Sequence, residues 1–176
     1  MSGCYKLLDP NQRPIVYIKD SLIANAGKGL FAKQFIKKDN PVVIYFGDIL
    51  NKNDTFELHS RNNKEYILNI APYIREIGNN TNFVNGNIAK SQKNVNLMGV
   101  MVNDIETIKN GIDNYLFSKD KCNLVIKETD DFPVYISTRD ILPDEELYAH
   151  YGLGYWLLID NIPPREIPKI MKSYVI

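Results

Sequence analysis

The chain has 176 residues, which fits one domain with a single sizeable core, and its 11 tyrosines and 7 phenylalanines favour strands. Basic and acidic side chains each number 21, so the chain lacks the net positive charge that holds a nucleic-acid backbone, and we expect no direct binding to nucleic acid. No apolar run approaches the ~20 residues needed to cross a bilayer, and residues 1–10 lack the apolar segment of a signal peptide, so we expect an intracellular protein without a membrane anchor.

The first half of the chain alternates short apolar runs with polar turns. Residues 15–23 have the β-branched character of a strand and lead into the turn 25–29, whose glycines permit a positive φ. A second strand is predicted at 42–46, where the apolar run is continuous. Residues 51–64 are polar and are expected on the surface, before a short strand at 66–70. This half is therefore predicted to form short strands joined by surface turns.

The second half begins with residues 78–96, which carry repeated Asn and Gly without an apolar period and are predicted to form a loop. One short helix is expected within 105–121. The apolar runs 124–126 and 134–136 flank an acidic connection and predict a hairpin. A further short helix is expected within 163–176, because two prolines stand at its start. The chain is thus predicted to be one domain in which strands predominate.

Several chemistries are excluded because the residues that they need are missing. Gly27 and Gly29 are followed neither by the third glycine of a dinucleotide fingerprint nor by the Gly-Lys-Ser/Thr ending of a phosphate loop. The only histidines are His59 and His150, which cannot form a His-Glu-x-x-His zinc helix and make a nucleophile–histidine–acid triad hard to assemble. The 2 cysteines are too few for a thiolate zinc cluster, so we expect reduced thiols and no metal.

Three separated segments carry the strongest signal in the sequence. The first segment is Ala26-Gly27-Lys28-Gly29-Leu30-Phe31-Ala32, followed by the strand 42–48. The middle segment is Met101-Val102-Asn103-Asp104, continued after an insertion by Cys122-Asn123-Leu124-Val125. The last segment is Tyr135–Ile141, followed by Glu145-Glu146-Leu147 and His150-Tyr151-Gly152. Together they resemble the SET domain, a family that methylates lysine in histones and other proteins. The middle segment and Val84-Asn85-Gly86 are more similar to the PR branch of this family, and Tyr155-Trp156 is similar to small viral members. Asp48 stands where the family usually has glutamate.

The resemblance implies a fold and a domain organisation. The implied fold is mostly β with short helices, the SET-domain β-clip architecture of several small sheets around a pseudoknot-like core. The implied methyltransferase domain spans residues 15–157. An N-terminal extension at 1–14 and a C-terminal tail at 158–176, which contains the predicted short helix, lie outside it.

The resemblance also implies an activity. The expected function is an S-adenosylmethionine-dependent protein lysine N-methyltransferase, with S-adenosylmethionine as methyl donor and without a metal. Its expected partner is a protein with an exposed lysine, by default a basic tail such as that of a histone. Such an enzyme is expected in the nucleus of a eukaryote, or in the host nucleus or cytoplasm if it is viral or bacterial. The oligomeric state is left open.

The departure from the family in the middle segment leaves two alternatives to an enzyme. The first is a PR/SET-like module that binds a protein partner with weak turnover or none. The second is a structural β-clip protein without a cofactor, in which the aromatic residues around Tyr151 form a packed core. Binding of S-adenosylmethionine separates an enzyme from both alternatives.

The family's functional positions are carried over by resemblance, residue by residue. Tyr151 matches the pocket tyrosine placed beside the transferring methyl group and Tyr45 matches a second tyrosine of the lysine channel, so these two are the candidate catalytic residues. The candidate cofactor-binding residues are Gly27, Lys28, Gly29, Asn103, Asp104, Tyr151 and Trp156. The candidate substrate channel consists of Tyr45, Tyr148, Ala149 and Trp156. Because Ala149 is small, room is expected for more than one methyl group.

Each of these assignments has a structural alternative. Tyr45 is also suited to core packing, the pair Asn103-Asp104 to capping a helix, and Trp156 to the core. His150 stands where the family usually has an acid and is expected as a polar group at the surface or core edge. The acidic residues 144–146 form either a solvated turn or a charge that steers a basic tail.

Overall fold

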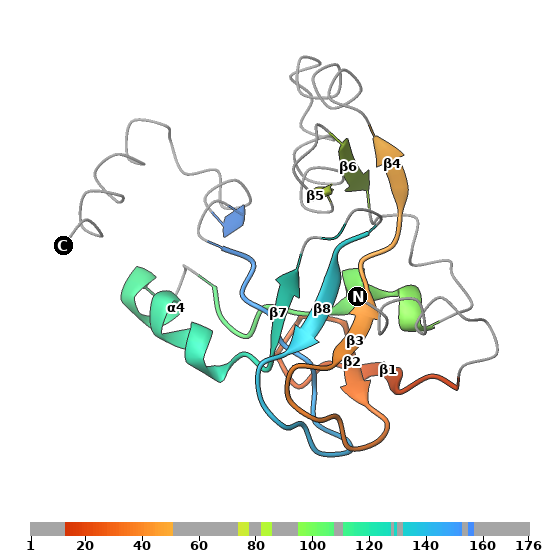
Figure 1. The fold of residues 1–176 in the computed structure, drawn as a ribbon. Helices are drawn as coiled ribbons and strands as arrows, with labels where there is room; N and C mark the ends of the chain where they lie inside the picture. Colours follow the sequence, from red (N-terminus) through yellow and green to blue (C-terminus); the bar gives the residue numbers. More distant parts are fainter. Residues whose placement is uncertain are drawn as a thin grey trace, which may run out of the picture.

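The computed structural model describes residues 13–50, 74–77, 82–85, 95–107, 111–127, 129, 132–152 and 155–156. Within these ranges the chain folds into three small antiparallel sheets, one α-helix and short 3₁₀ turns (Figure 1). None of the helices in the same ranges is long and apolar enough to span a membrane. The predicted fold class, mostly β with short helices, is confirmed.

The sheets bring together strands from distant parts of the chain. The first sheet pairs β1 (Val16–Asp20) with β2 (Lys28–Ala32). The second sheet has the strand order β3 (Pro41–Ile44), β8 (Val134–Ser137), β7 (Leu124–Lys127). The third sheet has the strand order β4 (Asp48–Leu50), β6 (Asn82–Asn85), β5 (Ile74–Ile77). The helical elements are η3 (Val95–Leu97), η4 (Gly99–Met101), α4 (Ile112–Ser118) and η6 (Lys119–Lys121).

β1 and β2 form a hairpin around an exposed turn. In this turn Asn25 and Gly27 both have a positive φ, of 64° and 75°. The Ser21 amide donates a hydrogen bond to the Gly27 carbonyl across the base of the turn, at 2.8 Å. Asparagine and glycine tolerate positive φ at lower cost than other residues do, which explains why the chain reverses here. The predicted strand, turn and strand are confirmed.

β7 and β8 form the second predicted hairpin, which is also confirmed, with Val125 opposite Ile136 in an antiparallel register. In the connection the Thr129 hydroxyl donates to the Phe132 carbonyl at 2.6 Å and accepts from the Phe132 amide at 3.2 Å. The other edge of β8 pairs with β3. β8 is therefore the central strand of this sheet.

The polar middle of the chain differs from its prediction in one place. Residues 78–96 were expected as a loop, but β6 lies within them and pairs with both β4 and β5, so the loop prediction is wrong there. Val84 of β6 is 0% exposed, and a strand of 4 residues is too short to show an apolar period. The helix predicted within 105–121 is confirmed as α4. The strand predicted at 66–70 and the tail 158–176 lie outside the described residues.

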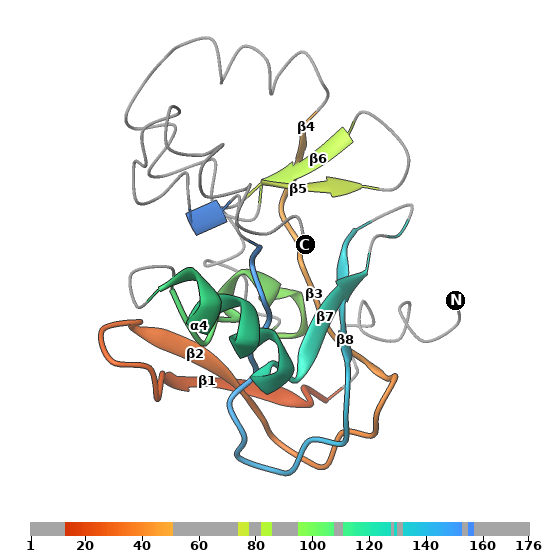
Figure 2. The same ribbon diagram turned by 90° about the vertical axis from the view of Figure 1, so that its left-hand side faces the viewer.

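Residues 146–149 join three parts of the fold. Their backbones pair with separate segments in the bridges Phe31↔Glu146, Asn103↔Tyr148 and Leu124↔Ala149. In both ribbon views the C-terminal blue segment runs between α4 and the sheet that contains β7 (Figures 1 and 2). A late segment held between early and middle segments agrees with the pseudoknot-like core that the resemblance implies.

The hydrophobic core surrounds this junction. Its fully buried members include Leu30, Phe31, Val42, Val43, Ile141 and Leu147. Burial of an apolar side chain of this size contributes about 1.5–3 kcal/mol, so the core anchors both ends of the last motif. The polar residues of that motif are thereby held in fixed positions.

Cys122 lies at the end of η6 and carries a free thiol. It is 8% exposed, and its Sγ lies 3.8 Å from the Ser118 carbonyl oxygen. Burial, and then the charge of Asp104, raises the pKa of Cys122 to about 12. The thiol therefore keeps its proton in the folded protein.

We expect Cys122 to react with an alkylating reagent at pH 8 roughly a thousandfold more slowly in the folded than in the unfolded protein, because only the thiolate is nucleophilic. The unfolded chain releases this proton near the ordinary value of 9.0 and the folded protein only at about 12, so the free energy of unfolding should fall as pH rises through this interval. Mass spectrometry of a Cys4→Ser variant, native and in urea, measures the rates. Equally fast labelling of both forms would contradict the buried position.

Candidate active site

Asn103 connects the first and the last sequence motifs. Its side-chain amide donates to the Lys28 carbonyl at 3.1 Å and to Glu146 Oε1 at 3.2 Å. Its own carbonyl accepts from the Ala149 amide at 3.0 Å. Residues far apart in the sequence are thereby joined at β2. The Lys28 side chain points elsewhere, to an exposed ion pair with Asp20 at 2.6 Å.

The two glycines of the first motif are required for different reasons. A Cβ built on Gly29 would lie 2.2 Å from Glu146 Oε1 and 3.1 Å from Asn103 Nδ2, so only glycine fits beside these side chains. A Cβ built on Gly27 meets nothing within 4 Å, but its φ of 75° disfavours other residues. Gly29 is therefore required by close packing and Gly27 by backbone conformation.

Gly29→Ala is expected to lower the free energy of unfolding by about 1–3 kcal/mol, because the added methyl overlaps the Glu146 carboxylate. Gly27→Ala is the matched control, with an expected loss of about 1 kcal/mol from its left-handed φ alone. Urea denaturation of both variants, each also made with Glu146→Ala, measures the effect. The Gly29 penalty should shrink in that background and the Gly27 penalty should not. Unchanged penalties at both positions would contradict the packing explanation.

Asp104 binds the chain around the last motif. Its carboxylate is buried, with the residue 7% exposed. Oδ2 accepts hydrogen bonds from the Tyr151 amide at 2.9 Å, from Trp156 Nε1 at 3.0 Å and from the Tyr115 hydroxyl at 3.0 Å. Oδ1 is buried and has no hydrogen-bond partner among the described residues. Asp104 does not cap α4, since Gly111 is the N-cap of that helix and no side-chain hydrogen bond caps it.

Aromatic rings gather around Asp104. Tyr151 stacks on Trp156 with centroids 6.3 Å apart and planes at 17°, and Tyr155 packs edge-on against both rings at 4.6 and 5.0 Å. Tyr115 of α4 lies 6.3 Å from Trp156. Tyr151 and Trp156 are half-buried, so Trp156 belongs to a partly exposed aromatic wall rather than to the core.

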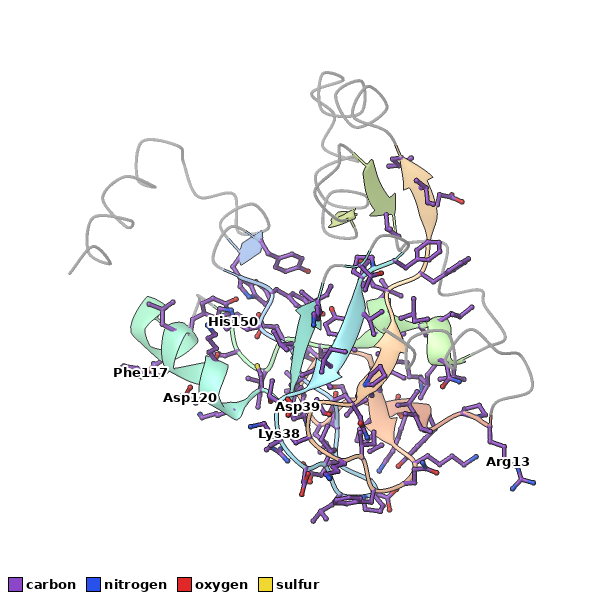
Figure 3. The ribbon with its side chains drawn as sticks, in the orientation of Figure 1. Arg13, Lys38, Asp39, Phe117, Asp120 and His150 are labelled. Atoms are coloured by element: carbon purple, nitrogen blue, oxygen red, sulfur yellow. The ribbon has the colours of Figure 1, made fainter. Side chains whose placement is uncertain are left out.

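His150 and Tyr115 form the side of this cluster that faces α4. Their ring centroids are 4.2 Å apart, and His150 Nδ1 lies 3.4 Å from the Tyr115 hydroxyl. Figure 3 shows His150 beside α4. Burial, and then the Asp104 charge, raises the pKa of Tyr115, which keeps its hydroxyl protonated as a donor to Asp104. His150 is half-buried, as expected for a polar group at the core edge.

The Tyr151 phenol reaches the middle motif. Its hydroxyl donates to the carbonyl of Val102. Val102 precedes Asn103, whose side chain binds the Lys28 carbonyl. Two consecutive residues therefore connect the tyrosine of the last motif to the β2 strand of the first motif. A site shared by Tyr151 and the Gly27–Gly29 turn needs the last and the first motif to be connected in this way.

Tyr45 follows β3 and is 2% exposed. Its ring packs edge-on against Tyr135 at 6.4 Å, as the packing alternative predicts. Its backbone forms a bridge to Met98 and lies against Gly99, where a Cβ would be 3.0 Å from the Tyr45 Cα. Gly99 begins the turn that ends at Val102, because the Val102 amide donates to the Gly99 carbonyl at 3.1 Å. Tyr45 is thus joined to the Tyr151 contact through this turn.

Tyr148 and Ala149 lie on the other side of the last motif. The half-buried Tyr148 hydroxyl donates to Glu146 Oε2 at 2.8 Å. Burial, and then the hydrogen bond to Glu146, raises the pKa of Tyr148 and keeps this hydroxyl protonated. Ala149 is 3% exposed. Among the acidic residues 144–146, Glu146 is 3% exposed, so its predicted role in steering a basic tail is wrong.

Sequence reasoning missed three residues that organise this region, namely Glu146 as a buried anchor, Tyr115 and Gly99. The only available signal for Glu146 was its place in the last motif. No signal distinguished Tyr115 from other aromatic residues of a short helix, since its partner Asp104 lies 11 positions earlier. Gly99 stands in an apolar run, where a lone glycine indicates a close backbone approach.

A family model described as the SET domain matches residues 27–152, well over half of the chain. The chain is a member of the SET-domain family. Members of the family are lysine methyltransferases. The matched range lies inside the domain predicted at 15–157 and covers the three motifs from Gly27 to Gly152, while Ala26, Tyr155 and Trp156 lie outside it. No curated protein matches the SET-domain chain by sequence.

Solved structures share the fold of this SET domain. They include polycomb repressive complex 2 of Chaetomium thermophilum, whose crystal structure has a chain 16% identical with a TM-score of 0.53, covering 80% of this chain and 16% of that one. The autoinhibited complex bound to S-adenosylmethionine gives 17% identity, a TM-score of 0.55 and coverages of 89% and 17%. The apo autoinhibited complex has a chain 16% identical with a TM-score of 0.56, and the match covers 89% of this chain and 18% of that one. At such identities the likeness concerns the fold, and the SET-domain chain spans less than a fifth of those chains.

Proposed function

We propose that this SET domain is an S-adenosylmethionine-dependent protein lysine N-methyltransferase. The observation that carries the proposal is the junction at Val102-Asn103, which accepts the Tyr151 hydroxyl on one side and binds the Lys28 carbonyl on the other. Candidate residues for the cofactor and for the reacting amine thereby lie within one connected site.

The residues at this junction fit S-adenosylmethionine, a cationic ligand with amino groups and an adenine ring. The buried Asp104 Oδ1, which has no partner among the described residues, suits a hydrogen-bond donor of such a ligand. The stacked rings of Tyr151 and Trp156 suit an aromatic or cationic group. The residues that would hold the cofactor are the backbone of Gly27, Lys28 and Gly29, together with Asn103, Asp104, Tyr151 and Trp156. When bound, S-adenosylmethionine supplies an electrophilic methyl group on a sulfonium.

The chain's own residues prepare the acceptor amine. At pH 7 deprotonation of an ordinary lysine, with a pKa of ~10.4, costs roughly 4–5 kcal/mol. Half-buried aromatic side chains such as Tyr148 and Tyr151 lower that cost, because desolvation disfavours the charged ammonium. The Tyr151 hydroxyl hydrogen is directed to the Val102 carbonyl, so toward a third group the phenol oxygen acts as an acceptor. An acceptor at this place orients an amine N–H and stabilises positive charge during methyl transfer.

The substrate class is proposed from the family and from the fold neighbours. A basic protein tail, by default that of a histone, is the proposed substrate, since the neighbours include a polycomb complex. The small side chain of Ala149 is proposed to leave room for more than one methyl group. A nuclear location, or a host nucleus or cytoplasm for a viral or bacterial protein, follows as part of the same proposal.

A PR/SET-like module that binds a protein without turnover is the second candidate, and one observation favours it. Both N–H groups of the Asn103 side chain are used within the protein, by Lys28 and Glu146, so neither donates to a cofactor in this arrangement. A module of this kind keeps the fold and the aromatic wall without binding S-adenosylmethionine.

Two measurements test the proposal. Calorimetric titration with S-adenosylmethionine should show saturable binding. Incubation with a methyl-labelled donor, purified histones and total cell lysate should label lysine residues, with Tyr151→Phe as the control. Absence of binding would overturn the enzyme and favour the binding module. Binding without labelling of any protein would overturn the proposed methyl transfer to these substrates.

A further inference from the structure

The Glu146 carboxylate is the most highly coordinated buried charge among the described residues. Oε1 accepts from the Ser21 hydroxyl at 2.6 Å and from the Asn103 amide at 3.2 Å. Oε2 accepts from the Leu22 backbone amide at 2.6 Å and from the Tyr148 hydroxyl at 2.8 Å. With the residue 3% exposed, these bonds replace the water that a carboxylate requires.

Two of the four donors belong to the base of the 21–27 loop, the exposed turn between β1 and β2. The Leu22 side chain is 70% exposed and residues 24–27 are exposed, so apolar packing does little to hold this loop. Its position depends on the Ser21–Gly27 backbone bond and on Glu146. A segment with little buried surface opens easily once such anchors are lost.

The other two donors belong to opposite parts of the candidate site. Asn103 lies at the junction proposed to hold the cofactor, and Tyr148 lies in the proposed lysine channel. The same carboxylate also lies against Gly29, where a Cβ would be 2.2 Å from Oε1. Glu146 is therefore in contact with the loop, the junction, the channel and β2 at once.

We infer that Glu146 is a positioning residue that couples the 21–27 loop, on the cofactor side, to the Tyr148 phenol, on the lysine side. This inference rests on the proposed methyltransferase function. Glu146 touches no reacting atom. It holds the base of the loop against β2 and fixes the Tyr148 hydroxyl in the same arrangement. Binding of S-adenosylmethionine and orientation of the acceptor lysine therefore depend on one carboxylate.

Glu146→Gln tests the acceptor role of the carboxylate directly, because it keeps the shape of the side chain and replaces one acceptor oxygen by an NH₂ donor. That NH₂ must face either Ser21 and Asn103 or Leu22 and Tyr148. The hydroxyl of each pair can rotate to accept from it, but the N–H of Asn103 or of Leu22 cannot, so one of these two anchors is lost. We expect the Kd for S-adenosylmethionine to rise about tenfold or more, and amide hydrogen exchange of the 21–27 loop in the ligand-free protein to accelerate to a similar extent.

Asp144→Asn is the matched control, since it also removes one negative charge two positions away. Asp144 is exposed, and the structure gives its carboxylate one hydrogen bond, from the Tyr17 hydroxyl at 2.8 Å. Its exchange pattern and Kd should match those of the unmodified protein. A general loss of stability would accelerate exchange in β3 and β8 as well, whereas a positioning role accelerates it in the loop first.

Two further variants separate the two sides of the coupling. Ser21→Ala should weaken binding of S-adenosylmethionine and leave the KM for the protein substrate unchanged. Tyr148→Phe should do the reverse. Glu146→Gln should show both effects.

The exchange rates and the Kd together test three claims, namely that Glu146 anchors the loop, that this anchoring affects cofactor binding, and that the protein binds S-adenosylmethionine. Loop exchange that Glu146→Gln leaves unchanged overturns the positioning role, whether or not the protein binds S-adenosylmethionine. Faster loop exchange with an unchanged Kd confirms the anchoring and overturns the coupling to the cofactor. An unmodified protein that does not bind S-adenosylmethionine overturns the proposed function, and with it the coupling, while the exchange data still decide whether Glu146 anchors the loop.

Discussion

Tyr151→Phe is expected to slow methyl transfer by about 10²- to 10³-fold and to leave the Kd for S-adenosylmethionine within about threefold of its original value. The variant removes only the hydroxyl, which donates to the Val102 carbonyl. The aromatic ring that stacks on Trp156 is kept, so a binding surface for the cofactor persists. Single-turnover transfer of a labelled methyl group and calorimetric titration measure the two quantities separately.

Two controls accompany this variant. Tyr17→Phe makes the same chemical change on β1, where the hydroxyl donates to the exposed Asp144, and should keep activity within about twofold. Chemical denaturation checks the fold of Tyr151→Phe, since loss of one hydrogen bond to Val102 costs about 1 kcal/mol. If Tyr151→Phe transfers methyl groups as fast as the unmodified protein, the phenol has no part in the reaction and the proposed role of Tyr151 is wrong.

Asp104→Leu is expected to lower the free energy of unfolding by about 3–5 kcal/mol and to release the aromatic segment at 151–156. The Asp104 carboxylate accepts from the Tyr151 amide, the Trp156 indole and the Tyr115 hydroxyl. Leucine has the same branched shape but carries no acceptor atom, so all three donors lose this acceptor. The indole reports the change directly, because Trp156 is the only tryptophan in the chain and its fluorescence should shift to the red.

Asp104→Asn separates the loss of the acceptor from the loss of the charge. Its side-chain oxygen can keep the Oδ2 position and its amino group can take the place of Oδ1, which has no partner among the described residues. The expected loss is then about 1–2 kcal/mol, the difference between charged and neutral acceptors. Asp120→Asn, on the exposed surface of η6, is the matched control and should be close to neutral. Equal stabilities of Asp104→Leu and Asp120→Asn would contradict the organising role of Asp104.

The local features of the fold could be predicted from the sequence because neighbouring residues encode them. The turn between β1 and β2 needs residues that tolerate positive φ, and Asn25 and Gly27 supply them. The β7–β8 hairpin follows from two apolar runs around an acidic connection. The strand β6 could not be predicted, because its 4 residues are too few for an apolar period to be detected.

The sequence by itself determined the family and supplied the motifs of the candidate site, because motif residues such as Gly27, Gly29 and Tyr151 stand in short contiguous stretches. Only the tertiary structure decided which atoms meet. Ser21 and Glu146 are 125 positions apart, and their contact turns a glutamate expected in solvent into a buried anchor. Likewise, Asp104 binds Tyr151 and Trp156 and does not cap α4. A hydrogen-bond partner is chosen by proximity in space and by exclusion of water, and neither quantity is encoded in the spacing of residues along the chain.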